Sequence, residues 1–385
     1  MREYVTTKRT MKTETETKIV KIAHIADVHL RNAQYGSHSR ADDFVLGMLN
    51  DIDKAAEMGI RHMIVAGDLL DTVNPGTRVC ITELDAIQAR AVERDITLYT
   101  ISGNHDRAVP SWVSRFGSEG PGFVDINNRT VDMDGVRVHG VPYMHDSEMR
   151  ELLPELPEAE VLVWHAALKD FAGFPVENAM TVQEFADTGK WQLLAMGDIH
   201  KYGSVTAEGP GGYEMLAVYP GSTELCSAAE EDTKCMVVHT FHDGWCDGEM
   251  RLDRSERVNF PTRRVQRFTV KTEEELDEAV GRFADDALIF VRYADNVPGA
   301  LMRLRAAVKG TALLVPTSFV AGTENCDMPE YGLDCGSPEE YLEHVLPQLA
   351  DSPEQAARIA GLCRAVITGN GDLVSEIEAY CESNK

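Results

Sequence analysis

The feature that most constrains the fold is a set of short apolar segments that each end in a compact polar motif. The first three end near residues 26, 66 and 101, and each has the length of a buried strand. Between them, residues 40–58 and the stretch around 84–91 repeat apolar side chains with the period of a helix. This alternation of strand and helix predicts a mainly parallel sheet whose two faces are covered.

The rest of the chain predicts further strands and a second, smaller α/β unit. Strands are expected at residues 137–140, 161–164, 193–196, 214–219 and 235–241. From residue 264 to 320 the order is again strand, helix, strand, helix, strand, and the proline-punctuated end of the chain favours short helices. We therefore predict a mobile tail at 1–18, a main α/β domain at 19–255, a small cap domain at 256–322 and a helical tail at 323–385.

The polar motifs at the strand ends carry the chemistry. Along the chain they are Asp-Val-His, Gly-Asp-Leu-Leu-Asp, Gly-Asn-His-Asp, a single His and Gly-Asp-Ile-His. In an open α/β sheet, groups just outside the carboxyl ends of the strands meet in one crevice. The side chains expected to meet there are Asp27, His29, Asp68, Asn104, His165, Asp198 and His200.

This donor set predicts a metal centre. Carboxylate, imidazole and amide donors together suit Mn²⁺, Fe²⁺ or Zn²⁺. Seven ligands are too many for one ion, whereas sharing Asp68 gives each of two ions about four protein ligands. Each motif alone is usually a turn or a surface feature. All five in this order, each at a strand end, favour a two-metal site for displacement at phosphorus.

The series of motifs resembles that of the calcineurin-like metallophosphoesterases, from residue 21 to about residue 222. The resemblance implies an α/β sandwich of two mixed sheets flanked by helices. It implies a first metal ion held by Asp27, His29, Asp68 and His200, and a second held by Asp68, Asn104, His165 and Asp198. It also makes His105 the acid that protonates the leaving oxygen, Asp106 the residue that orients His105, and Asp71 a residue behind the ligands. Asp198 departs from the family pattern, which has a histidine there.

Further motifs are similar to those of the SbcD family, the nuclease subunits of SbcCD-type DNA repair complexes. They are residues 103–107, 140–143 and 219–224, together with the appended cap. Protein Ser/Thr phosphatases differ, because they usually carry Arg-Gly where this chain has Thr72-Val73. The resemblance implies a cap that contacts DNA and a partner similar to SbcC, a coiled-coil ABC-type ATPase. Residues 323–385 are candidates for docking on that partner, and equally for packing on the cap.

The charge distribution gives a separate indication about nucleic acid. The net charge is −26, from 37 basic and 63 acidic residues, which argues against a chain that coats nucleic acid by itself. Residues 251–271, however, hold seven basic and two acidic side chains, a local charge of +5. This basic strip is either a solvated linker or a contact for DNA phosphates. Its basic members are Arg251, Arg254, Arg257, Arg263, Arg264, Arg267 and Lys271.

Cysteine usage and hydropathy predict a cytoplasmic location. The eight cysteines form no Cys-x-x-Cys pair, which is typical of reduced thiols in a chain of this length. No apolar run approaches the roughly 20 residues of a membrane helix, and the first residues have no apolar core of a secretory signal.

The resulting prediction is a Mn²⁺-dependent DNA exonuclease and endonuclease, the nuclease subunit of an SbcCD-like repair and recombination complex. Mg²⁺, Fe²⁺ and Zn²⁺ are the alternative metals. DNA, the SbcC-like ATPase and a second copy of the chain are the expected partners, and no membrane is expected. Two other interpretations stay open: a small-molecule phosphodiesterase acting on cyclic nucleotides or nucleotide-lipids, and a catalytically weak scaffold that bridges DNA and an ATPase. The cap and the basic strip favour the nuclease, and Asp198 alone favours the scaffold.

Overall fold

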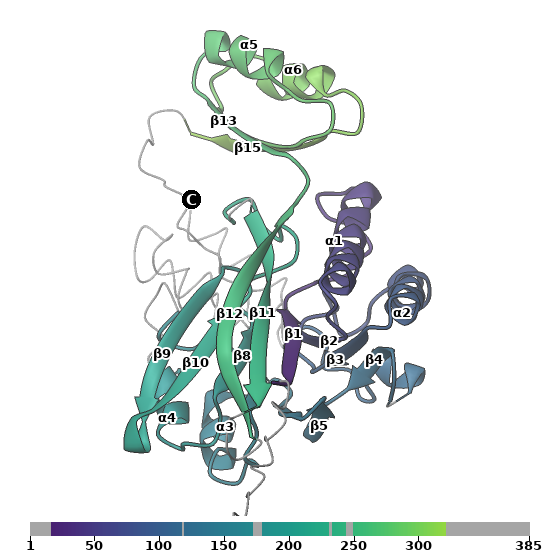
Figure 1. The fold of residues 1–385 in the computed structure, drawn as a ribbon. Coiled ribbons are helices and arrows are strands. Elements are labelled where there is room, and N and C mark those ends of the chain that lie inside the picture. The colour runs from purple at the N-terminus through teal and green to yellow at the C-terminus, as the bar shows by residue number, and fades with distance from the viewer. Residues whose placement is uncertain (1–16, 118, 172–178, 231–232, 244–248, 321–385) are drawn as a thin grey trace, which may run out of the picture. The chain divides into compact units, whose positions relative to one another are not determined.

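The computed structural model describes residues 17–117, 119–171, 179–230, 233–243 and 249–320 (Figure 1). The helical tail predicted at 323–385 lies outside the described residues, as does nearly all of the tail predicted at 1–18. The strands of the described residues form two six-stranded sheets and a separate three-stranded sheet. Across these ranges the helices are too short or too polar to span a bilayer.

The first sheet carries the three strands that the sequence places before the first three motifs. Its order is β12 (Met250–Pro261), β11 (Thr233–Asp243), β1 (Ile19–Ile25), β2 (His62–Val65), β3 (Thr97–Thr100) and β4 (Gly122–Asp125). The last four run parallel, while β11 and β12 are antiparallel to their neighbours. Helices α1 (His38–Glu57) and α2 (Leu84–Glu93) bury Met48, Ile52 and Ile87 against one face of this sheet (Figure 1).

The second sheet lies against the other face of the first. Its order is β5 (Arg129–Met133), β6 (Val136–Gly140), β7 (Val161–His165), β8 (Leu193–Gly197), β10 (Tyr213–Tyr219) and β9 (Gly203–Gly209). Ile22 and Ile64 of the first sheet share one buried core with Val163 and Leu193 of the second. Helices α3 (Asp146–Leu152) and α4 (Val182–Ala186) cover the outer face of the second sheet. This is the predicted sandwich of two mixed sheets flanked by helices, and the prediction is confirmed.

Three short helical turns complete this domain. They are η1 (Arg78–Glu83), η2 (Trp112–Phe116) and η3 (Pro210–Gly212). The first leads directly into α2, and the third joins β9 to β10.

The cap is a compact βαβαβ unit, and all five of its predicted elements are confirmed. They are β13 (Val265–Val270), α5 (Glu273–Gly281), β14 (Leu288–Ala294), α6 (Ala300–Ala307) and β15 (Leu313–Phe319). The three strands are parallel and lie in chain order. Leu276 and Leu304 of the helices are buried against Ile289 and Val291 of the central strand. The Thr272 hydroxyl accepts a hydrogen bond from the Glu275 amide at 3.2 Å and so caps the start of α5.

One strand crosses the domain border that the sequence predicts at residues 255 and 256. Strand β12 pairs with β11 from Met250 to Pro261, so the first sheet extends beyond that border. The charged side chains of the basic strip hide the alternation of this strand in the sequence. A strand at the edge of a sheet can carry such charges, since its outer side faces solvent and charges there discourage pairing with another chain.

Candidate metal centre

The carboxyl ends of five strands meet, and His165 lies at the middle of the group. Its Nε2 atom is 3.4 Å from Asp68 Oδ2, 3.7 Å from Asp198 Oδ1 and 3.9 Å from Asp27 Oδ1. Asn104 Oδ1 lies 3.1 Å from the same nitrogen. Four strand-end loops therefore bring their predicted ligands to the end of β7.

The two remaining predicted ligands lie on the other side of Asp68. His29 Nε2 is 3.7 Å from Asp68 Oδ2 and 3.1 Å from His200 Nε2. Asp68 is thus the side chain that contacts both the His165 group and the His29 group. This is the position that a carboxylate shared by two ions would occupy.

Four of the seven predicted ligands have backbone angles that residues other than glycine rarely adopt. The φ angles are 53° at Asp27, 49° at His29, 49° at Asp68 and 97° at Asp198. Such conformations cost about 1–3 kcal/mol each and concentrate at functional sites. Here they are held by hydrogen bonds between loops, including one from the His29 amide to the Asp68 carbonyl at 2.9 Å.

The glycines of the motifs are required by close packing around the ligands. A Cβ atom at Gly67 would collide with the imidazole of His165, and one at Gly103 would collide with the carboxylate of Asp68. Gly67 also has a φ of 87°, which favours glycine. The Gly-Asp and Gly-Asn-His-Asp motifs therefore have glycine where the neighbouring ligand leaves no room for a side chain.

The three histidines in the set share one orientation. In each ring Nδ1 faces a fixed oxygen, which leaves Nε2 toward the other ligands. The partners are Ala66 O at 2.7 Å for His165, Glu230 Oε1 at 2.9 Å for His200 and Asp71 Oδ1 at 3.4 Å for His29. Metal-binding histidines typically donate their other nitrogen to a carbonyl or carboxylate in this way. Asp71, expected behind the ligands, is one of these partners, and Arg31 pairs with it at 2.8 Å.

The electrostatics of the crevice favour positive charge. Burial acts to raise the pKa of Asp68, but His165, His29 and His105 hold that pKa well below its usual range. Burial acts to lower the pKa of His165, but Asp68, Asp27 and Asp198 hold it well above its usual range. The carboxylates therefore stabilise a cation among them.

The amide of Asn104 supports the same conclusion. Its side-chain amide lies within hydrogen-bond distance of both His165 Nε2, at 3.1 Å, and the carboxylate of Asp68. The ligand atoms of Asp27, Asp68 and His165 lie within 4.8 Å of one another, as do those of His29, Asp68 and His105. The residues present therefore fit divalent metal ions.

His105 and Asp106 take different places. The His105 amide donates to Asp68 Oδ1 at 2.9 Å and its ring Nδ1 donates to Asp71 O at 3.0 Å, while the half-buried ring keeps Nε2 4.0 Å from Asp68 Oδ2. The Asp106 carboxylate instead accepts from the amides of Gly103 at 2.5 Å and Leu69 at 2.9 Å. The carboxylate of Asp106 thus bonds the loop of Asp68 to the loop of His105, and its orienting role stays a prediction. Burial, and then Asp68, raise the pKa of Asp106 to about 7.

Glu230 is a residue of the site that the sequence motifs do not predict. Its buried carboxylate accepts from His200 Nδ1 at 2.9 Å, from Lys234 Nζ at 2.5 Å and from Ser222 Oγ at 3.1 Å. It also accepts from the amide of Cys226 at 3.1 Å. The available signal was an acidic residue shortly after the Gly-Ser turn that follows β10. Nothing in that segment, however, indicates which strand-end group it contacts.

The basic strip is divided between exposed and internally bonded side chains. Arg251 and Arg254 are more than half exposed on β12, and Arg254 pairs with Asp253 and Glu256. Arg263 is 14% exposed and pairs with Asp43 at 2.9 Å. Arg257 lies over the ring of Tyr202, and Arg264 lies beside Arg263 in a hollow that Asp43 also lines. Arg267 donates to the carbonyls of Ala228 and Glu230, and Lys271 follows β13 directly.

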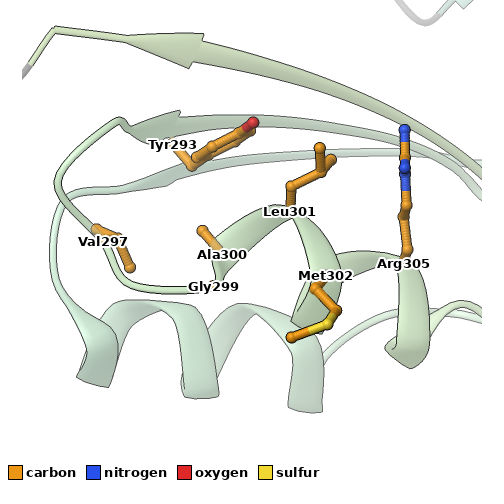
Figure 2. Close-up of a pocket in the computed structure, with 7 residues that line it drawn as sticks. All are labelled: Tyr293, Val297, Gly299, Ala300, Leu301, Met302 and Arg305. Atoms are coloured by element: carbon orange, nitrogen blue, oxygen red, sulfur yellow. The ribbon is translucent and has the colours of Figure 1, made fainter.

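The cap contains a hollow of about 460 Å³, which no sequence motif predicts (Figure 2). Tyr293 of β14 lines it together with residues just before and within α6, which are Val297, Gly299, Ala300, Leu301, Met302 and Arg305. These residues include no carboxylate, histidine or cysteine, so the hollow offers none of the donors of the strand-end crevice.

Comparison with known proteins finds relatives over about two thirds of this chain. A DNA double-strand break repair protein Mre11 of Methanosarcina acetivorans is 30% identical over 267 residues, which are 66% of this chain and 41% of that protein. The Mre11 protein of Methanosarcina mazei is 28% identical over 267 residues, which are 66% of this chain and 40% of that protein. The chain thus spans about two fifths of the length of these curated relatives.

Among solved structures, the calcineurin-like phosphoesterase YfkN of Bacillus subtilis aligns with a TM-score of 0.38 and 13% identity, over 64% of this chain and 91% of that one. The family model of the calcineurin-like phosphoesterase superfamily domain matches residues 20–244, which hold all seven predicted ligands. Because this match covers more than half of the sequence, the chain belongs to the calcineurin-like phosphoesterase superfamily.

Proposed function

We propose that the chain is a Mn²⁺-dependent DNA exonuclease and endonuclease, the nuclease subunit of an SbcD- or Mre11-like repair complex. The observation that carries the proposal is the position of Asp68, which contacts the His165 group on one side and the His29 group on the other. The matched relatives are named as DNA double-strand break repair proteins, which supports DNA as the substrate. Mg²⁺, Fe²⁺ or Zn²⁺ in the same site are the alternatives.

Two sets of residues hold the ions in this proposal. Asp27, His29 and His200 hold one ion with Asp68, and Asn104, His165 and Asp198 hold the other with Asp68. When bound, the ions polarise the backbone phosphate and lower the pKa of the attacking water. The chain itself fixes the direction of two of the ligand histidines, because Nδ1 of His165 bonds to Ala66 O and Nδ1 of His200 bonds to Glu230 Oε1.

His105 is the proposed general acid. Its ring is partly exposed, unlike those of His29 and His165, so a substrate can reach it. Asp71 O fixes its Nδ1, and in the imidazolium form Nε2 then carries the proton that the departing sugar oxygen needs. We infer that Asp106 supports this step by holding the loop that carries His105, and that it does not touch the imidazole.

The proposal also covers the residues that contact DNA and the protein partners of the chain. We infer that Arg251, Arg254 and Arg257, on the exposed edge strand, contribute phosphate contacts, and that the cap adds others. A coiled-coil ABC-type ATPase and a second copy of the chain are the proposed protein partners, with residues 323–385 as the candidate docking segment. The proposed location is the cytoplasm.

The test compares substrate classes. The full chain with Mn²⁺ is incubated with end-labelled duplex DNA, with closed circular DNA and with a panel of cyclic nucleotides and nucleotide-lipids. We expect cleavage of both DNA substrates, abolished by EDTA and restored by Mn²⁺. Efficient turnover of one small nucleotide with no cleavage of either DNA would contradict the nuclease and favour a small-molecule phosphodiesterase. Metal binding without turnover of any substrate would favour a scaffold.

A further inference from the structure

A cysteine lies beside two of the proposed metal ligands. The sulfur of Cys226 and one ring nitrogen each of His29 and His200 all lie within 4.8 Å of one another. That spacing is small enough for a single ion to bind all three atoms. Neither the motifs of the sequence nor the two ligand sets proposed above include this thiol.

The carboxylate of Glu230 fixes the loop that carries Cys226. The amide of Cys226 donates to Glu230 Oε2 at 3.1 Å, and the other oxygen of Glu230 accepts from His200 Nδ1 at 2.9 Å. One carboxylate therefore sets both the direction of the His200 ring and the position of the cysteine backbone. Lys234 Nζ, at 2.5 Å from Glu230 Oε2, balances the charge of that carboxylate.

The two sides of the centre then differ in chemistry. Beside the shared Asp68, the set with His165 holds Asn104 and Asp198, which are oxygen donors, and a single imidazole. The set with His29 and His200 holds Asp27, two imidazoles and, beside them, the thiol of Cys226. Oxygen donors suit Mn²⁺ and Mg²⁺, whereas imidazole and thiolate donors favour Zn²⁺, Fe²⁺ and Co²⁺.

We propose that Cys226 is a further metal ligand on the His29–His200 side of the centre, and that this side takes Zn²⁺, Co²⁺ or Fe²⁺ in preference to Mn²⁺. The inference rests on the two-metal centre proposed above and adds a ligand to it. The centre then holds two different metals, with the harder ion on the oxygen-rich side.

The test uses Co²⁺ alone as the probe, added to the metal-free full chain. Thiolate ligation gives a near-ultraviolet charge-transfer band that oxygen and imidazole ligands do not give. We expect this band in the wild type, its loss in Cys226→Ser and its retention in Cys235→Ser. Cys235 is a matched control, because its sulfur contacts the carbonyl of Pro220 at 3.1 Å and belongs to none of the ligand groups.

Affinity provides a second readout. In calorimetry, Cys226→Ser should weaken Co²⁺ binding by at least ~10-fold, because loss of a residue that only supports a ligand already costs that much. Its effect on Mn²⁺ binding should be smaller. In the wild type, Co²⁺ should also protect Cys226 from iodoacetamide, as mapped by mass spectrometry. This protection assay needs no variant, so it holds even where the serine variant folds poorly.

Three outcomes would overturn the inference. One is Co²⁺ binding to the wild type without a thiolate band. Another is an equal band and equal affinity in Cys226→Ser, and the third is full alkylation of Cys226 in the presence of bound Co²⁺. None of these measurements uses DNA. A chain that fails to cleave DNA but shows the Cys226-dependent band would contradict the proposed nuclease and support the thiol ligand.

Discussion

The strand-end crevice and the basic strip are both rich in charge, but they hold their charges in opposite ways. In the crevice, Asp27, Asp68 and His165 are buried, and His165 lies 3.4 Å from Asp68 and 3.9 Å from Asp27. On β12, Arg251 and Arg254 are more than half exposed. Buried charges interact strongly and depend on precise positions, whereas exposed charges are screened by water and salt. Loss of one crevice ligand should therefore abolish chemistry, and loss of one strip arginine should only weaken binding.

The largest effect is expected for Asp68→Ala. Because Asp68 contacts both sides of the crevice, its loss should remove both metal ions and all cleavage. Metal analysis after dialysis against Mn²⁺ should find close to two ions per wild-type chain and close to none in the variant. Asp53→Ala, which removes a surface partner of Arg90 and Arg94, is the control and should keep both ions. Full metal occupancy in the Asp68 variant would break the proposed distinction between crevice and strip.

His105→Ala is expected to have the next largest effect, because general acid catalysis contributes roughly 10²–10⁴-fold. The variant should keep metal stoichiometry and DNA affinity while its single-turnover cleavage rate falls by about that factor. A substrate with a good leaving group, such as a p-nitrophenyl phosphodiester, needs little protonation and should lose less. An equal loss on both substrates, or unchanged DNA cleavage, would remove His105 from the acid role.

Glu230→Gln should have a smaller effect, confined to one side of the centre. Supporting residues behind metal ligands typically contribute about 10–100-fold in metal affinity. Since Glu230 holds His200 but contacts no residue of the His165 side, calorimetry should show one weakened and one unchanged binding event. Glu160→Gln is the control, because Glu160 is also a buried carboxylate but pairs with Arg137. Equal weakening of both events would show that the two sides act as one unit.

The smallest effect is expected on the strip. Each phosphate contact contributes about −0.9 to the slope of log affinity against log salt concentration. Changing Arg251, Arg254 and Arg257 together to alanine should flatten that slope by up to about 2.7 units, with the p-nitrophenyl diester rate unchanged. Arg263→Ala should instead lower the unfolding temperature, because its 14% exposed side chain bonds Asp43. An unchanged salt slope in the triple variant would take β12 out of DNA binding.

How far the sequence predicts the structure depends on the range of the interaction. The five strand-end motifs were predictable, because each ligand follows its own strand and the sheet brings the ends together. The cap was predictable since its helices and strands have clear apolar periods. The edge strand β12 was not, because its charges mask the alternation. The roles of Glu230 and Asp106 were not, because they depend on contacts between residues 30 and 37 positions apart.

The central claim is that one carboxylate joins two metal positions, and the most direct measurement is anomalous diffraction from crystals grown with Mn²⁺. We expect two peaks roughly 3.5–4 Å apart, with Asp68 between them, His165 on one peak and His200 on the other. A single peak, or two peaks of which one lacks Asp68 as a ligand, would contradict the two-metal account.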